Sequence, residues 1–156
     1  MLTHAHLDHI GIVNKLQKKY SIPVFMHQDD EELANTLSEY CKYFNIDNLK
    51  SPKITTYVDD ADLFQLNDYK IKVIHTPGHT LGGVCYLLDN NLFSGDTIFN
   101  GSIGRTDLPG GNHDVLIDSI KNKIFLLDEK VTIHSGHGDS TTIKKEKKEN
   151  VFLNNV

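Results

Sequence analysis

The segment that most constrains the fold of this chain is residues 3–9, which read THAHLDH. Four of its side chains are metal-ligand types, namely His4, His6, Asp8 and His9. Imidazoles at this density would repel one another if they were protonated, and burying them without partners would be costly. A bound cation removes both problems, so the segment predicts a metal site.

The spacing of these side chains predicts how a cation would be held. If residues 2–6 are extended, His4 and His6 point to the same face, because side chains alternate along a strand. Asp8 and His9 then lie at the turn into an apolar-periodic helix, where Asp8 is a candidate N-cap. Two pairs of ligands suggest two metals. Imidazole and carboxylate ligands without thiolate suit zinc, iron or manganese at a catalytic site.

Four side chains cannot complete two coordination shells, and the remaining chain offers three further candidates. Each lies in a glycine-flanked turn after a predicted strand: His79 in HTPGHT, Asp96 in FSGDT and His137 in SGHGD. Any one of them alone would be an ordinary loop residue. Together with the first segment they form an ordered set of seven candidate ligands.

This ordered set resembles the metallo-β-lactamase fold superfamily, whose pattern is HxHxDH followed by His, Asp and His. Residues 101–107, GSIGRTD, are similar to those of short glyoxalase II-like hydrolases. The resemblance implies an α/β fold, an αββα sandwich. It also implies that His4, His6 and His79 hold one metal and that Asp8, His9 and His137 hold the other, with Asp96 bridging.

The same resemblance implies a metal-dependent hydrolase that acts on a small-molecule thioester. Two divalent ions, with zinc expected first and iron or manganese as alternatives, would share a hydroxide that serves as the nucleophile. Asp8 is the candidate to orient that hydroxide and accept its proton. Arg105 either forms a local ion pair with Asp107 or meets an anionic group of the substrate.

Two other functions remain open. The skeleton also resembles persulfide dioxygenases, in which one iron would be held by His4, His79 and Asp96. An inactive, truncated metal-binding domain is a second alternative. A β-lactam hydrolase is disfavoured, because the GSIGRTD loop departs from the pattern expected there and no export signal is visible.

Length and composition limit the remaining possibilities. The 156 residues, with 38% hydrophobic content, predict one domain spanning 1–156. A net charge of −5 without a basic stripe argues against nucleic acid, and no apolar run approaches a bilayer span. Cys41 and Cys85 are expected to be free thiols in a cytoplasmic protein.

Periodicity predicts alternating strands and helices, as expected for an α/β layer. Helices are predicted at 9–20, 28–44 and 114–127 and from 141, and strands at 24–26, 54–58, 64–66, 69–74, 84–88, 92–93 and 131–133. The charged run 144–149 indicates a solvated helix face. Because few residues precede His4, the resemblance implies a first sheet that is incomplete at the N-terminus, with an edge liable to self-association.

Overall fold

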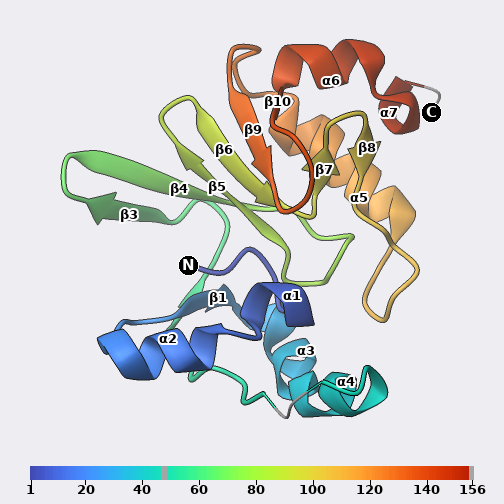
Figure 1. Ribbon diagram of the computed structural model, residues 1–156. Helices are drawn as coiled ribbons and strands as arrows, with labels where there is room; N and C mark the ends of the chain where they lie inside the picture. Colours follow the sequence, from blue (N-terminus) through green and yellow to red (C-terminus); the bar gives the residue numbers. More distant parts are fainter. Residues whose placement is uncertain (47–48, 155–156) are drawn as a thin grey trace.

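A six-stranded mixed sheet forms one layer of the computed structural model, which describes residues 1–46 and 49–154. The strand order is β10-β9-β6-β5-β4-β3. Its strands are β3 (Leu63–Leu66), β4 (Tyr69–His75), β5 (Val84–Leu88), β6 (Asn91–Gly95), β9 (Thr132–Ser135) and β10 (Thr141–Thr142). In Figure 1 this sheet lies in the upper half of the molecule, with the C-terminal helices beside it.

The N-terminal part of the chain forms the facing layer. Strands β1 (Phe25–His27) and β2 (Thr56–Val58) pair in parallel as a two-stranded sheet. The helices of this layer are α1 (Leu7–Ile10), α2 (Val13–Tyr20), the 3-10 turn η1 (Gln28–Asp30), α3 (Glu31–Asn35) and α4 (Leu37–Tyr43). They occupy the lower half of Figure 1.

Helices also cover the outer face of the large sheet. They are α5 (His113–Ser119), the π-helical turn η2 (Ile120–Ile124), α6 (Ile143–Glu149) and α7 (Val151–Asn154). A small hairpin of β7 (Ile98–Phe99) and β8 (Ser102–Ile103) precedes them. The order helix, sheet, sheet, helix is the αββα sandwich that the sequence predicted.

Three apolar clusters correspond to the three interfaces of this sandwich. Alternation along β4 sends Val73 to one face and Ile74 to the other. Val73 packs with Val58 of β2 between the two sheets, whereas Ile74 packs with Leu116 of α5 beneath the large sheet. The third cluster joins the N-terminal segment, β1 and the helices α1, α3 and α4. The cluster that includes Val58 and Val73 joins the two layers.

Most predicted elements are present, but three details of the prediction were wrong. The two N-terminal helices are each interrupted, the first around Gly11 and Ile12 and the second at Thr36. Asp8 is not an N-cap, because α1 begins at Leu7 and His6 occupies the capping position. The charged run of α6 is not uniformly solvated, because Glu146 is fully buried.

Candidate metal centre

The topology of the large sheet explains why three distant residues meet. Strand β4 is antiparallel to β5, β5 is antiparallel to β6, and β6 is parallel to β9. Strands β4, β6 and β9 therefore run in the same direction and end at the same edge of the sheet. His79, Asp96 and His137 lie in the turns that follow these three strands. The N-terminal segment reaches this edge through the backbone hydrogen bond from Val84 to Thr3.

Three of the candidate ligands form a largely buried group, His4, His6 and His79. His79 Nε2 lies 2.9 Å from His6 Nδ1 and 3.3 Å from His4 Nε2. His4 and His6 do face the same side, as the alternating spacing predicted, although the segment before α1 is not part of a regular strand. One ligand atom from each of the three side chains lies within 4.8 Å of the others.

The second group is more open and consists of Asp8, His9 and His137. His137 Nε2 lies 3.0 Å from Asp8 Oδ2, and His9 Nε2 lies 3.7 Å from that same oxygen. The side chains of Asp8 and His137 are 56% and 57% exposed, whereas that of His9 is 16% exposed. This group therefore faces solvent on one side.

Asp96 lies between the two groups. Its Oδ1 is 3.3 Å from His9 Nε2, and its Oδ2 is 3.7 Å from His79 Nε2 and 3.5 Å from His137 Nε2. One carboxylate thus faces a histidine of the buried group and two of the open group. The structure brings all seven candidate ligands together, and His4, His9 and Asp96 form a further group of adjacent ligand atoms that links the two.

Burial and mutual proximity shift the pKa values in this cluster. Burial, reinforced by the neighbouring imidazoles, holds the pKa of His4 far below its usual value and lowers that of His6 to about 4. Burial also lowers the pKa of His9, but the Asp96 carboxylate more than offsets this and the net shift is upward. The pKa of Asp96 is lowered by His9, His79 and His137 against the opposing effect of burial. His4 and His6 are therefore neutral near pH 7, the form in which imidazole binds metals.

The cluster also contains polar atoms with no hydrogen-bond partner. Within the residues that the structure describes, His6 Nε2, His9 Nε2 and Asp96 Oδ1 are buried and unsatisfied. The 3.3 Å approach of His9 to Asp96 is close enough for attraction but is not a hydrogen bond. Buried polar atoms without partners are costly. Two of these atoms, His9 Nε2 and Asp96 Oδ1, face each other across a position where a divalent cation would satisfy both.

Neighbouring groups orient the candidate ligands. His79 Nδ1 is 2.7 Å from the carbonyl oxygen of Arg105, which fixes the proton on Nδ1 and leaves Nε2 free to bind. Gly136 permits the close approach of its loop, because a Cβ there would lie 2.3 Å from Asp96 Oδ1. Such contacts give a metal site its shape before any metal binds.

Sequence reasoning missed one residue of this shell, Asp30. Its side chain is 1% exposed and accepts hydrogen bonds from the backbone N–H of Ala5, the hydroxyl of Thr80 and the backbone N–H of Gly82. Burial raises its pKa even against these three hydrogen bonds. Asp30 thereby ties the first histidine segment to the His79 loop. In the sequence it is indistinguishable from an acid in the first turn of a helix.

Another group of adjacent ligand atoms, within 4.8 Å of one another, consists of His27, Asp29 and His75. His27 and His75 stack with ring centroids 4.1 Å apart and an interplanar angle of 10°. His27 Nδ1 accepts a hydrogen bond from the backbone N–H of Asp29, and His75 Nε2 lies 2.9 Å from the carbonyl oxygen of Leu81. Because the rings are parallel, their in-plane lone pairs do not converge on one point. The stacking and these contacts orient both rings.

The chain belongs to the metallo-beta-lactamase superfamily, a class of metal-dependent hydrolases whose fold binds divalent metals. The family model described as "Metallo-beta-lactamase superfamily" matches residues 1–137. The chain is 34% identical to hydroxyacylglutathione hydrolase GloC from Haemophilus influenzae over 158 residues, which cover 99% of this chain and 74% of that protein.

Solved structures agree with this assignment. The BLEG-1 B3 metallo-beta-lactamase superposes with a TM-score of 0.88 at 38% identity and covers 97% of this chain and 75% of that one. The protein TTHA1623, solved in a di-iron-bound form, gives a TM-score of 0.86 at 32% identity over the same shares. Both the predicted family and the predicted fold class are thus confirmed.

One further finding concerns membranes. Across residues 1–46 and 49–154, no helix has the length and apolar character needed to cross a bilayer.

Proposed function

We propose that the seven-residue cluster holds two divalent metal ions and that the protein hydrolyses thioesters. The observation that carries this proposal is the convergence of two ligand groups on the shared carboxylate of Asp96, with buried nitrogen and oxygen atoms left unsatisfied between them. The donor set fits the metals, because it contains imidazole and carboxylate and no thiolate. Zinc is the first expectation, with iron or manganese as alternatives.

Each group would hold one ion. His4 Nε2, His6 Nδ1 and His79 Nε2 are the donors of the buried group, since these are the atoms that face one another. Asp8, His9 and His137 are the donors of the open group, and the two oxygens of Asp96 face both. When bound, two such ions supply a Lewis acid for the carbonyl oxygen and lower the pKa of water toward ~7.

The protein's own residues would position and deprotonate the attacking water. Asp8 is the candidate base, because its carboxylate lies at the solvent-facing side of the cluster. The water oxygen bonds to the acyl carbon, the carbon–sulfur bond breaks, and the sulfur leaves as a thiolate that takes up a proton. The products are a carboxylic acid and a thiol. The GSIGRTD loop and the similarity to a hydroxyacylglutathione hydrolase support the thioester as substrate.

The test is an activity assay on protein loaded with a defined metal. Zinc-, iron- and manganese-loaded samples are incubated with lactoyl-glutathione, with a chromogenic cephalosporin, and with glutathione persulfide under an oxygen electrode. We expect metal-dependent thiol release that a chelator abolishes. Oxygen uptake by a protein with one iron would instead support the dioxygenase alternative, and cephalosporin cleavage without thiol release would support β-lactam hydrolysis.

A further inference from the structure

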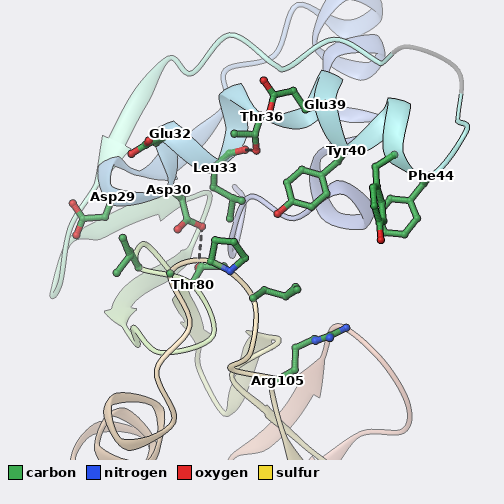
Figure 2. A pocket seen from close by; sticks show the side chains of 15 residues that line it. Asp29, Asp30, Glu32, Leu33, Thr36, Glu39, Tyr40, Phe44, Thr80 and Arg105 are labelled. Carbon is green, nitrogen blue, oxygen red and sulfur yellow. Dashed lines mark hydrogen bonds between the residues drawn. The ribbon is translucent and has the colours of Figure 1, made fainter.

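A groove of about 930 Å³ lies between the helices α3 and α4 on one side and two loops on the other (Figure 2). The loops are those around Thr80 and around Arg105 to Gly110. Its volume falls within the range of ~300–1,000 Å³ that is usual for small-molecule sites. The groove is therefore large enough for a substrate moiety.

The groove adjoins the candidate metal centre. Thr80 directly follows His79, and the backbone of Arg105 accepts the hydrogen bond from His79 Nδ1. A small cavity lined by His6 shares Leu33 and Tyr40 with the groove. A substrate whose acyl carbon lies at the metals can thus extend one of its ends into the groove.

Aromatic and aliphatic side chains form much of the wall. Tyr40, Tyr43 and Phe44 come from the end of α4 and the residue after it, and Figure 2 shows Tyr40 and Phe44 on the side opposite Arg105. Tyr43 and Phe44 meet edge to face, with ring centroids 5.0 Å apart. Aromatic faces attract organic cations as well as apolar groups.

The charged residues of the groove are unbalanced. Asp29, Glu32 and Glu39 line it and are exposed, and neither Glu32 nor Glu39 has an ion-pair partner among the residues that the structure describes. The groove has one basic residue, Arg105. Its guanidinium donates from Nε and one terminal nitrogen to the two carboxylate oxygens of Asp107, both at 2.7 Å. The charge that could meet an anionic substrate is therefore already neutralised.

We propose that this groove binds the thiol part of the substrate and selects a thiol that carries a positively charged amine on an apolar body. This inference rests on the proposed thioester hydrolysis. A cationic amine finds aromatic faces and unpaired carboxylates, whereas a carboxylate or phosphate of the carrier would meet like charges. The contact between Arg105 and Asp107 is thus the local ion pair that the sequence offered as one interpretation of Arg105. Because this pair neutralises Arg105, the carboxylates that line the groove are left in excess.

The test uses three acetyl thioesters that differ in the thiol alone. Thiocholine supplies a cationic carrier, 3,3-dimethylbutanethiol its neutral isostere, and 3-mercaptopropanoate an anionic carrier. We expect kcat/KM to fall in that order on metal-loaded protein. Glu32→Gln and Glu39→Gln should each lower kcat/KM for the thiocholine ester by about twofold to fivefold and leave the neutral ester unchanged.

Two further variants serve as control and converse. Glu31→Gln removes a negative charge from α3, the helix that also carries Glu32. Glu31 does not line the groove and accepts a hydrogen bond from Tyr57 instead. This substitution should therefore leave the order of kcat/KM among the three esters unchanged. Asp107→Asn releases Arg105 and should raise kcat/KM for the anionic ester. Calorimetric binding of S-methylthiocholine, which is not hydrolysed, measures the groove independently of catalysis.

The outcomes separate this inference from the proposed function. Hydrolysis of all three esters at equal rates, or fastest for the anionic ester, overturns the groove assignment and leaves thioester hydrolysis standing. Absence of hydrolysis for every ester, with S-methylthiocholine still binding in a manner sensitive to Glu32→Gln, overturns the proposed function and supports the groove as a cation site. Absence of both hydrolysis and binding overturns both.

Discussion

The two halves of the candidate metal centre differ in burial although they share a carboxylate. The half formed by His4, His6 and His79 is enclosed by the sheet edge and the first helix segment, and the imidazoles of His4 and His6 are held neutral. The half formed by Asp8, His9 and His137 is open, with two of its three side chains more than half exposed. The buried half is suited to retaining an ion, and the open half is suited to meeting the substrate.

This difference in burial predicts that the two halves bind their ions with different affinities. Neutral, buried and mutually adjacent nitrogens are already arranged for a cation, so little reorganisation is needed when one binds. The open half includes a largely exposed histidine and a solvated carboxylate, so its ion should bind more weakly and exchange faster.

Removing a ligand of the buried half should have the largest effect. His4→Ala is expected to reduce bound metal from two ions to one or none and to lower kcat/KM by more than about 100-fold. This loss is larger than the one expected when a residue that only hydrogen-bonds to a metal ligand is removed. Elemental analysis and the thiol-release assay measure both quantities. His113→Ala, an exposed histidine at the start of α5, is the control and should behave as wild type. If His4→Ala retains both metals, the buried half does not hold its ion more firmly than the open half.

Removing a ligand of the open half should have a smaller effect. His137→Ala is expected to lose one ion, to keep the buried one, and to lower kcat/KM by roughly 10- to 100-fold. Because the side chain is largely exposed, the Tm of the metal-free protein should be unchanged. Loss of both ions from His137→Ala would show that the two halves bind cooperatively.

Asp30 supports the buried half from outside it. Asp30→Asn keeps the shape but replaces one acceptor with a donor, which would face either the N–H of Gly82 or the N–H of Ala5 and the Thr80 hydroxyl. We expect a loss of about 1–3 kcal/mol in the free energy of unfolding, measured with urea. Asp114→Asn is the matched control, because Asp114 is an exposed acid in the first turn of α5. Equal effects of the two substitutions would deny Asp30 a special role.

Acid should destabilise the metal-free protein through the buried half. The pKa values of His4 and His6 are lowered on folding, so the unfolded state binds more protons below pH ~6.5 and stability falls as the pH drops toward 4. His9 acts in the opposite direction, because its pKa is raised. The pKa of His27 is also lowered, and three lowered values against one raised value predict a Tm lower by about 5 °C at pH 5 than at pH 7. An unchanged or higher Tm at pH 5 would contradict the buried, neutral state.

The sequence singled out the candidate ligands more readily than their surroundings for a physical reason. Ligands such as His4 and His6 lie close together in the chain, and their period-two spacing specifies a common face. His79, Asp96 and His137 could be found because each follows a strand and is flanked by glycine. That they meet depends on three strands running in the same direction, which local patterns do not encode.

Residues that act through tertiary hydrogen bonds left no such pattern. Asp30 and Glu146 both lie in acidic or charged stretches, where solvation is the usual outcome. Glu146 is instead buried and accepts hydrogen bonds from Thr141, from the N–H of Gly101 and from Asn150. The helix start at Leu7 likewise depends on packing, so the N-cap prediction for Asp8 failed.

The most direct test of the account is the number of metal ions bound per chain, measured by native mass spectrometry on protein titrated with zinc. The account predicts two ions in the wild type and one ion in His137→Ala. As the chelator concentration rises, the ion of the open half should be lost before the ion of the buried half. A wild-type chain that saturates at one ion, or that binds none, would contradict it.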